Sequence, residues 1–330
     1  MNLIYIILIL LCQSYLVFSQ SLPNNHYIYH STKYLYDAGK NWDNLTIFGP
    51  IRFKSKPRNK LNDPKSFDSF DGQISLNTSH ESYLLNGHWY FKYRDYYGYF
   101  YPIFSKKIDK NHYTYLNTKQ IKNQYNHSGI GYENNWAILQ IGRGRESWGA
   151  GNEIQLALSE NSSTYDYFLL GSDYGKIRVR YIYGFLEKVK TNINRYITAR
   201  GFEWTNKESL VIGFSETIIY SGENRSYDIG YLNPISSHLE IELNNRLNII
   251  GDRNSNAVWQ AHLDYLIMKN FRISLNYLID EFVIDPDIEI GKEHGKAYSI
   301  RLAYTPLFSN SHLITLFSSL VYVGTPTFRH

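Results

Sequence analysis

Hydrophobic and polar residues alternate with a period of two along much of the middle and C-terminal parts of the chain. In residues 258–268, Trp259 and Leu263 belong to an apolar set, and Gln260 and Asp264 belong to the intervening polar set. The same alternation recurs in residues 85–93, 177–183, 271–280, 297–306 and 312–323. This pattern predicts β-strands that each have one apolar face and one polar face.

The lengths of these segments favour a barrel over a β-sandwich. Many run for about ten residues or more, close to the roughly 9–11 residues with which a tilted strand crosses a bilayer. Their polar faces carry charged and amide groups, as the wall of a water-filled lumen does, and aromatic residues lie near the strand ends. The predicted fold class is therefore all-β, a large transmembrane antiparallel β-barrel of the bacterial outer membrane with about fourteen candidate strands.

The predicted connections differ in length as they do in outer-membrane barrels, which have short periplasmic turns and long outer loops. The short turns lie near Asn206, Lys269 and Ser309, and the long connections are Ser221–Asn256 and Glu281–Lys296. Because short and long connections must alternate, residues 238–248 are expected to belong to an outer excursion and not to form a transmembrane strand.

The N-terminus predicts export. Residues 1–20, MNLIYIILILLCQSYLVFSQ, contain the wholly apolar run Leu3–Leu11 and small residues ahead of a cleavage near Ser19. This is typical of a secretory signal peptide, with a retained membrane anchor as the alternative. Cys12 is the sole cysteine, so the mature chain is expected to have no disulfide and no cysteine-bound metal.

Between the signal peptide and the barrel, residues 21–72 are expected to form one short periplasmic helix and a polar linker. In Asn24–Lys40 the spacing is helical, and Gly39 is a plausible C-cap; the residues with that spacing are Tyr27, His30, Ser31, Tyr34 and Leu35. The barrel is assigned to residues 73–330. The formal charge of +4 comes with no long basic run, which argues against a nucleic-acid partner.

The stretch Ile141–Gly151, IGRGRESWGAG, concentrates candidate chemistry. It lacks the lysine of a phosphate loop, and a strand-like segment follows it where nucleotide-binding folds have a helix. Arg143 and Arg145 offer planar donors for carboxylates or phosphates, Glu146 can neutralise one of them, and Trp148 can stack on a sugar or simply pack. Two interpretations stay open: a buried Arg–Glu network that holds an inward segment, or direct contact with a ligand.

Other candidate sites are weaker. Arg178 and Arg180 fall on the polar set of a predicted strand and would line the lumen. Acidic residues at Asp285, Asp287 and Glu289 only loosely match a calcium loop, so a solvated outer loop is expected there. The histidines show no metal-binding spacing. We therefore expect no metal and no cofactor, and the sequence singles out no catalytic residue, although a carboxylate pair for glycoside cleavage stays open because its separation is a three-dimensional property.

Several motifs occur in the order seen in one known family. Gly142-Arg143 precedes Trp148–Gly151, a Leu-rich segment ends at Ser159, and Asn233-Pro234 follows downstream. In these motifs the chain resembles the Wzi-type capsule-assembly family of bacterial outer-membrane proteins, over about residues 138–330. The resemblance implies a non-catalytic barrel lectin in the cell outer membrane, which binds capsular polysaccharide and retains it at the cell surface.

The chain departs from that family in two respects. First, its predicted strands are fewer and its predicted helical part is smaller than those of the family. Second, the sequence ends in GTPTFRH without a strand that finishes on an aromatic residue. We therefore expect a C-terminally truncated member whose last strand has an unpaired edge.

The expected partners are capsular or surface polysaccharide and outer-membrane lipid, and the chain is expected to be a monomer. A porin-type channel, in which Arg178 and Arg180 set the ion preference, is the first alternative function. A secreted β-sandwich enzyme that cleaves glycans is the second.

Overall fold

The alternating segments of the sequence form one antiparallel sheet. The computed structural model describes residues 35–40, 42, 45–48, 69–79, 82–106, 127–151, 155–159, 162–189, 192–244, 254–280, 295–309, 312–325 and 327. Within these ranges the sheet has fourteen strands. They are β1 (Ser69–Ser79), β2 (Ser82–Tyr93), β3 (Tyr96–Tyr101), β4 (Ile103–Lys106), β5 (His127–Glu133), β6 (Ala137–Gly144), β7 (Tyr165–Asp173), β8 (Ile177–Val189), β9 (Ile193–Thr205), β10 (Leu210–Glu223), β11 (Asn254–Met268), β12 (Phe271–Asp280), β13 (Gly295–Phe308) and β14 (Leu313–Val323).

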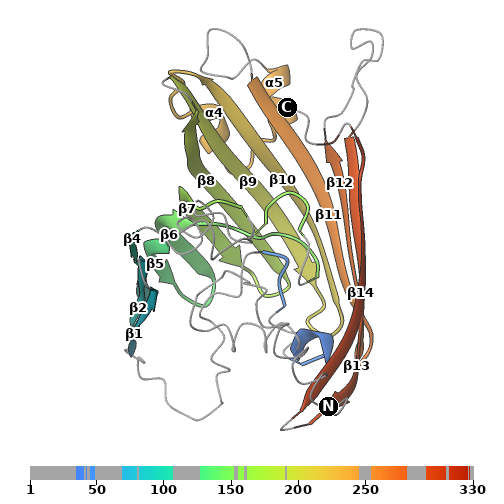
Figure 1. Cartoon of the computed structure of the whole chain (residues 1–330). Coiled ribbons are helices and arrows are strands. Elements are labelled where there is room, and N and C mark those ends of the chain that lie inside the picture. The colour runs from blue at the N-terminus through green and yellow to red at the C-terminus, as the bar shows by residue number, and fades with distance from the viewer. Residues whose placement is uncertain are drawn as a thin grey trace.

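The strands follow one another in a meander. Each pairs with its neighbours in chain order, except that β4 pairs with β2 and β3 continues to β5. Figure 1 shows the strands as a strongly curved wall. The predicted all-β antiparallel class is thus confirmed, whereas closure is not observed, because no pairing among the described residues joins β1 to β14.

The two ends of the sheet have different connections. The connections that follow β2, β5, β7, β9, β11 and β13 lie at one end of the sheet, the short-turn end. The connections that follow β6, β8, β10 and β12 lie at the other end, the long-loop end. The turn after β9 has a local cause, because the Asn206 carboxamide oxygen accepts hydrogen bonds from the backbone NH groups of Glu208, Ser209 and Leu210. The turns predicted near Asn206, Lys269 and Ser309 are confirmed.

The distribution of burial across the sheet is inverted relative to a water-soluble sheet. On β12, Arg272, Ser274 and Asn276 are buried, whereas Ile273 is half-buried and Tyr277 is exposed on the opposite face. The same alternation holds along β13 and along β11 from Val258 to Ile267. The exposed apolar residues on the outward face include Ile130, Leu139, Ile141, Ile177, Val179, Phe202, Trp204, Ile212, Phe214, Tyr265, Ile267, Ile300, Leu302 and Tyr304.

Two segments cover the inward face of the sheet. The N-terminal segment (described residues 35–48) and the inward segment (described residues 145–159) form a core with β6–β11, in which Phe48 and Trp148 pack with Leu169, Ile182 and Val211. Short bridges join Phe48 to Trp148 and Trp148 to Leu158. The interior is therefore filled by polypeptide where these segments lie.

Among the residues that the structure describes, one excursion covers part of the outward face. The α4–α5 excursion (residues 224–244) follows β10 and contains α4 (Ile229–Leu232) and α5 (His238–Leu243), which Figure 1 places at the long-loop end. Tyr231 and Ile241 pack on outward side chains of β8–β11, among them Tyr181, Tyr196 and Tyr220. The stretch from His238 is thus helical and not an additional strand, in agreement with the predicted excursion.

Several predicted features fall wholly or partly outside the described residues. These include the signal peptide (residues 1–20), most of the linker and the acidic loop 281–293. Of the expected helix Asn24–Lys40 only the end is described: Leu35–Asp37 is helical, and Gly39 follows with a φ of 70°. The sheet begins at Ser69, before the predicted start at Gln73.

In the described parts of the chain, no helix is long and apolar enough to span a bilayer.

Candidate functional site

The inward segment begins where β6 ends. After Gly144 the chain turns across the inner face of the sheet and returns only at β7. Glu146 and Trp148 are almost completely enclosed, with exposed fractions of 0% and 1%. The Glu146 carboxylate accepts hydrogen bonds from Trp148 Nε1 at 3.2 Å and from the Tyr167 hydroxyl at 2.8 Å. The Phe48 ring meets Trp148 edge to face at 5.0 Å.

Arg143 and Arg145 lie on opposite faces of the wall. Arg145 is buried on the inward side and donates to the Ser162 carbonyl at 2.8 Å. Arg143, in contrast, shares the outward face of β6 with Ile141, opposite Asp166 of β7. Its guanidinium contacts the Asp166 carboxylate at 2.8 Å, and about a third of its side chain is exposed. The interpretation of this stretch as a buried network in an inward segment therefore does not hold for Arg143, because β6 continues to alternate through that position.

Arg178 and Arg180 lie on the inward face, as their alternation predicts. Arg178 donates to the Glu203 carboxylate at 2.6 Å, to Asp173 at 3.1 Å and to the Leu45 carbonyl at 2.7 Å. Arg180 lies over the Phe48 ring. Both arginines therefore contact the N-terminal segment, which partly occupies the space that the lumen interpretation left to water.

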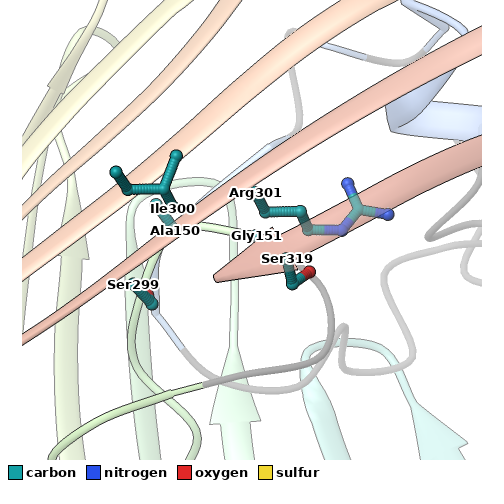
Figure 2. A pocket seen from close by; sticks show the side chains of 6 residues that line it. All are labelled: Ala150, Gly151, Ser299, Ile300, Arg301 and Ser319. Atoms are coloured by element: carbon teal, nitrogen blue, oxygen red, sulfur yellow. The ribbon is translucent and has the colours of Figure 1, made fainter. Parts of the chain in front are cut away.

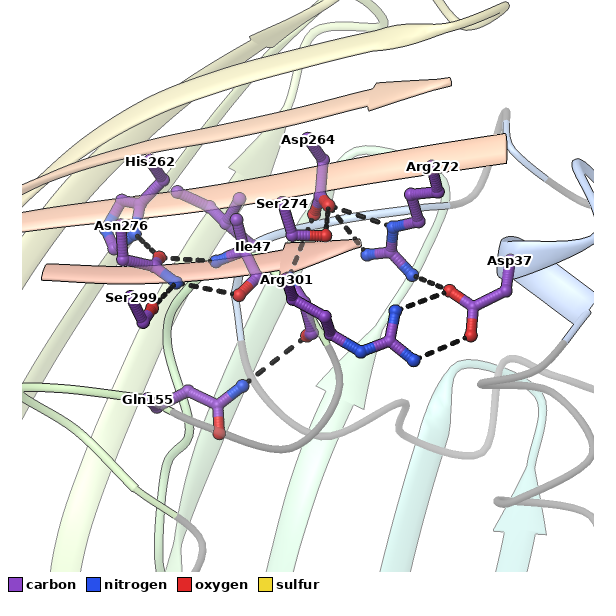
Figure 3. Close-up of polar contacts among 12 residues, drawn as sticks. Asp37, Ile47, Gln155, His262, Asp264, Arg272, Ser274, Asn276, Ser299 and Arg301 are labelled. Atoms are coloured by element: carbon purple, nitrogen blue, oxygen red, sulfur yellow. Dashed lines mark hydrogen bonds and ion pairs between the residues drawn. The ribbon is translucent and has the colours of Figure 1, made fainter. Parts of the chain in front are cut away.

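The middle of the inward segment is fixed to β11 and β12. Figure 3 shows the Asn276 carboxamide among these polar contacts. It accepts from the Ala150 NH at 2.7 Å and donates to the Ala150 carbonyl at 2.8 Å. Gly151 donates to Asp264 and has a φ of 87°, a conformation that favours glycine. The glycines of the motif thus allow the backbone of the inward segment to approach the wall closely.

A buried charge network holds the N-terminal segment, and the sequence pattern did not reveal it. Figure 3 shows the Asp37 carboxylate facing two guanidinium groups. It accepts from Arg301 at 2.9 and 3.0 Å and from Arg272 at 3.1 Å, and Arg272 also pairs with Asp264 at 2.9 Å. Ser274 donates to the same Asp264 carboxylate. The only sequence signal was the presence of arginines on the polar faces of β12 and β13.

A small pocket lies between the inward segment and the last two strands (Figure 2). It is lined by Ala150, Gly151, Ser299, Ile300, Arg301 and Ser319 and has a cavity volume of about 10 Å³. That is about the space that one water molecule needs, whereas ligand pockets generally start at about 300 Å³. The pocket is therefore too small to be the main binding site of a polysaccharide.

Ser215, His262 and Asn276 form a chain of hydrogen bonds that resembles a nucleophile, a base and an orienting amide. His262 Nε2 lies 2.9 Å from the Ser215 hydroxyl, and its Nδ1 lies 2.9 Å from the Asn276 carboxamide oxygen. All three side chains are almost fully buried, and Asn276 is bonded to Ala150. A substrate would have to displace the inward segment, so this arrangement acts as an anchor for that segment. In the ranges that the structure describes, no cluster of three His, Cys, Asp or Glu residues could hold a metal ion.

Comparisons with known proteins identify no family. No family model matches the chain, and no curated protein matches it either. Among solved structures it is similar to OmpT, an outer membrane protein of Vibrio cholerae, at 9% identity over 78% of this chain and 79% of that chain, with a TM-score of 0.36. It is also similar to Pseudomonas aeruginosa OccK10 (OpdN), at 8% identity over 79% of this chain and 89% of that chain, with a TM-score of 0.25. TM-scores this low support no argument, so the fold rests on strand pairing and burial, and the Wzi-type resemblance stays a prediction.

Proposed function

We propose that this chain is an outer-membrane β-barrel protein that retains surface polysaccharide without cleaving it. The observation that supports the membrane location is the inverted burial of the sheet. Arg272, Ser274 and Asn276 are enclosed, whereas the apolar residues on the outward face are exposed. Exposing such a continuous apolar surface to water is unfavourable, whereas lipid acyl chains solvate it.

Retention is favoured over conduction because polypeptide fills part of the interior. The N-terminal segment contacts Arg178 and Arg180, and the inward segment is bonded to Asn276. A lumen occupied in this way restricts the passage of ions. Binding at the long-loop end does not require an open lumen.

Among the candidate residues, Arg143 is the best placed for an acidic polysaccharide. It lies at the end of β6 nearest the long-loop end, and its partner Asp166 has an exposed fraction of 59%. Exchanging an exposed carboxylate for a ligand carboxylate costs little, because surface ion pairs contribute only about 0–1 kcal/mol. Trp148 and Glu146 are enclosed and serve to hold the inward segment.

Fractionation followed by a retention assay tests this proposal. We expect the mature protein in the outer-membrane fraction, and we expect vesicles that carry it to retain acidic capsular polysaccharide. Arg143→Ala should reduce retention by about tenfold, the equivalent of about 1.4 kcal/mol. Arg195→Ala is the matched control, because the Arg195–Glu187 pair has the same 2.8 Å length and similar exposure.

Other results would favour the alternatives. Equal retention by both variants would remove Arg143 from the binding surface, and no retention by the unmodified protein would refute the lectin proposal. A large steady conductance in planar bilayers would favour the channel. A water-soluble mature protein that releases reducing sugars would favour the glycan-cleaving enzyme.

A further inference from the structure

The outward wall of β8–β10 carries charge where a lipid-facing wall should not. Arg200 and Glu216 are directly opposite each other on β9 and β10 and form an ion pair at 3.1 Å. They share the outward face with Val179, Phe202 and Phe214, which are exposed. Facing lipid, an arginine or a carboxylate near the middle of a membrane strand is strongly destabilising.

The α4–α5 excursion covers this pair and forms a hydrogen bond with one polar atom of each side chain. The Glu216 carboxylate accepts a hydrogen bond from the His238 backbone NH at 3.0 Å, and Arg200 donates to the Asn233 carbonyl at 3.1 Å. Tyr181 donates to the Tyr231 carbonyl at 2.7 Å. The polar groups of the wall thus face the backbone of the excursion.

Between Ser226 and Leu239 the surface that the excursion presents to its surroundings carries no charge, and the half-buried Glu240 of α5 follows this stretch. Between Ser226 and Leu239 the acidic residue Asp228 is buried against the wall, where its carboxylate caps α4. The exposed apolar side chains are Tyr227, Ile229, Leu232, Ile235 and Leu239. The exposed fractions of Ile229 and Ile235 reach 71% and 88%. Such a segment buries its charge and exposes its apolar side chains, the reverse of an ordinary surface loop.

The height of the apolar wall below the excursion is insufficient for a bilayer. On β10 the uncovered outward positions run from Leu210 to Phe214, because Glu216 is already covered. At about 3.3 Å per residue this stretch is about 13 Å long. The apolar band of an outer-membrane barrel is about 25 Å tall. The remaining height of the apolar band corresponds to the part of the wall that the excursion covers.

We propose that the exposed face of the α4–α5 excursion lies against the bilayer and completes the lipid-facing band over β8–β11. Its occupant is the acyl and interfacial region of the lipid leaflet at the long-loop end. This proposal rests on the outer-membrane location proposed above. The excursion is therefore a membrane-contacting cover that shields the Arg200–Glu216 pair from lipid.

Spin-label accessibility in lipid vesicles tests the proposal. Single cysteines replace Ile235 and Leu239 in a Cys12→Ser background, and the labelled full-length protein is exposed to oxygen, which enters lipid, and to a water-soluble nickel chelate. Phe202→Cys is the control for the lipid-facing wall, and Lys188→Cys is the aqueous control at the same end of the sheet. We expect the labels at both excursion positions and at Phe202 to be more accessible to oxygen than to the chelate. We expect the label at Lys188 to be more accessible to the chelate.

The controls separate this inference from the proposed function. If the chelate reaches the labels at Ile235 and Leu239 while oxygen reaches the label at Phe202, the membrane contact of the excursion is wrong but the outer-membrane location stands. Labels shielded from both reagents at the excursion would indicate a protein partner or a second copy and would also overturn it. Chelate access at Phe202 would instead refute the outer-membrane location.

Discussion

Removal of the Asp37 carboxylate tests whether buried charge holds the N-terminal segment on the wall. In Asp37→Ala, Arg301 loses the carboxylate that it contacts with two guanidinium nitrogens, whereas Arg272 retains Asp264. Asp37, Arg272 and Arg301 are all almost fully buried. The variant thus leaves a buried guanidinium without its main counter-charge.

The magnitude follows from that burial. Removing one partner of a buried pair costs about 3–5 kcal/mol, because the remaining charge is desolvated without compensation. Asp166→Ala is the matched control. It removes a carboxylate from an ion pair of similar length with Arg143, but both side chains of that pair are substantially exposed. An exposed pair contributes at most about 1 kcal/mol.

Equilibrium urea unfolding in lipid vesicles, followed by tryptophan fluorescence and by heat-modifiable migration in gels, measures both variants. We expect Asp37→Ala to lower the free energy of unfolding by about 3–5 kcal/mol and Asp166→Ala by no more than about 1 kcal/mol. Equal losses would refute the argument, because they would mean that the Asp37 network is hydrated or that the N-terminal segment is not bound to the wall.

Two further substitutions test the contacts of the interior. Gly213→Ala places a methyl group against the Ile47 side chain, so we expect the free energy of unfolding in urea to fall by about 1–3 kcal/mol. Gly171→Ala is the control, because its added methyl group meets no atom closer than 3.6 Å, and its free energy of unfolding should change by no more than about 1 kcal/mol. Equal losses in the two variants would contradict the packing of Ile47 against Gly213. Trp148→Phe removes one hydrogen-bond donor from the fully buried Glu146 carboxylate, so we expect the free energy of unfolding to fall by about 1–3 kcal/mol in thermal or urea unfolding. An unchanged unfolding midpoint would contradict this hydrogen bond.

The period-two pattern revealed the strands and which residues share a face. It separated Gln260 and Asp264 from Trp259 and Leu263, and the structure encloses the polar pair on the inward face. The side-chain period of a strand is a local property, so it can be read without knowing the neighbouring strands.

The coverage of each face could not be predicted in this way. The ion pairs of Asp37 with Arg272 and Arg301 join residues 235 and 264 positions apart. The sequence does carry a signal for the cover over Arg200 and Glu216, because two opposite charges on an apolar strand face must be shielded from lipid. That signal was not visible before the strand register was known.

The Ile141–Gly151 stretch lies inside only in part, because Ile141 and Arg143 face outward on β6. Arg145, Glu146, Trp148 and Ala150 are buried on the inward side. Arg143 still belongs to β6 and faces outward. The boundary between strand and loop decided its position, and strand ends are difficult to place from sequence because regular alternation stops there gradually.

A fluorescence quenching scan along β13 tests the central claim, which is that the apolar face of the sheet contacts lipid and the polar face is enclosed. Labelled cysteines replace Ile300, Leu302 and Tyr304 on one face and Ser299 and Ala303 on the other, in vesicles of brominated lipid. The structure predicts strong quenching at the first three positions and weak quenching at the other two. Uniform quenching, or quenching only at Ser299 and Ala303, would contradict the claim.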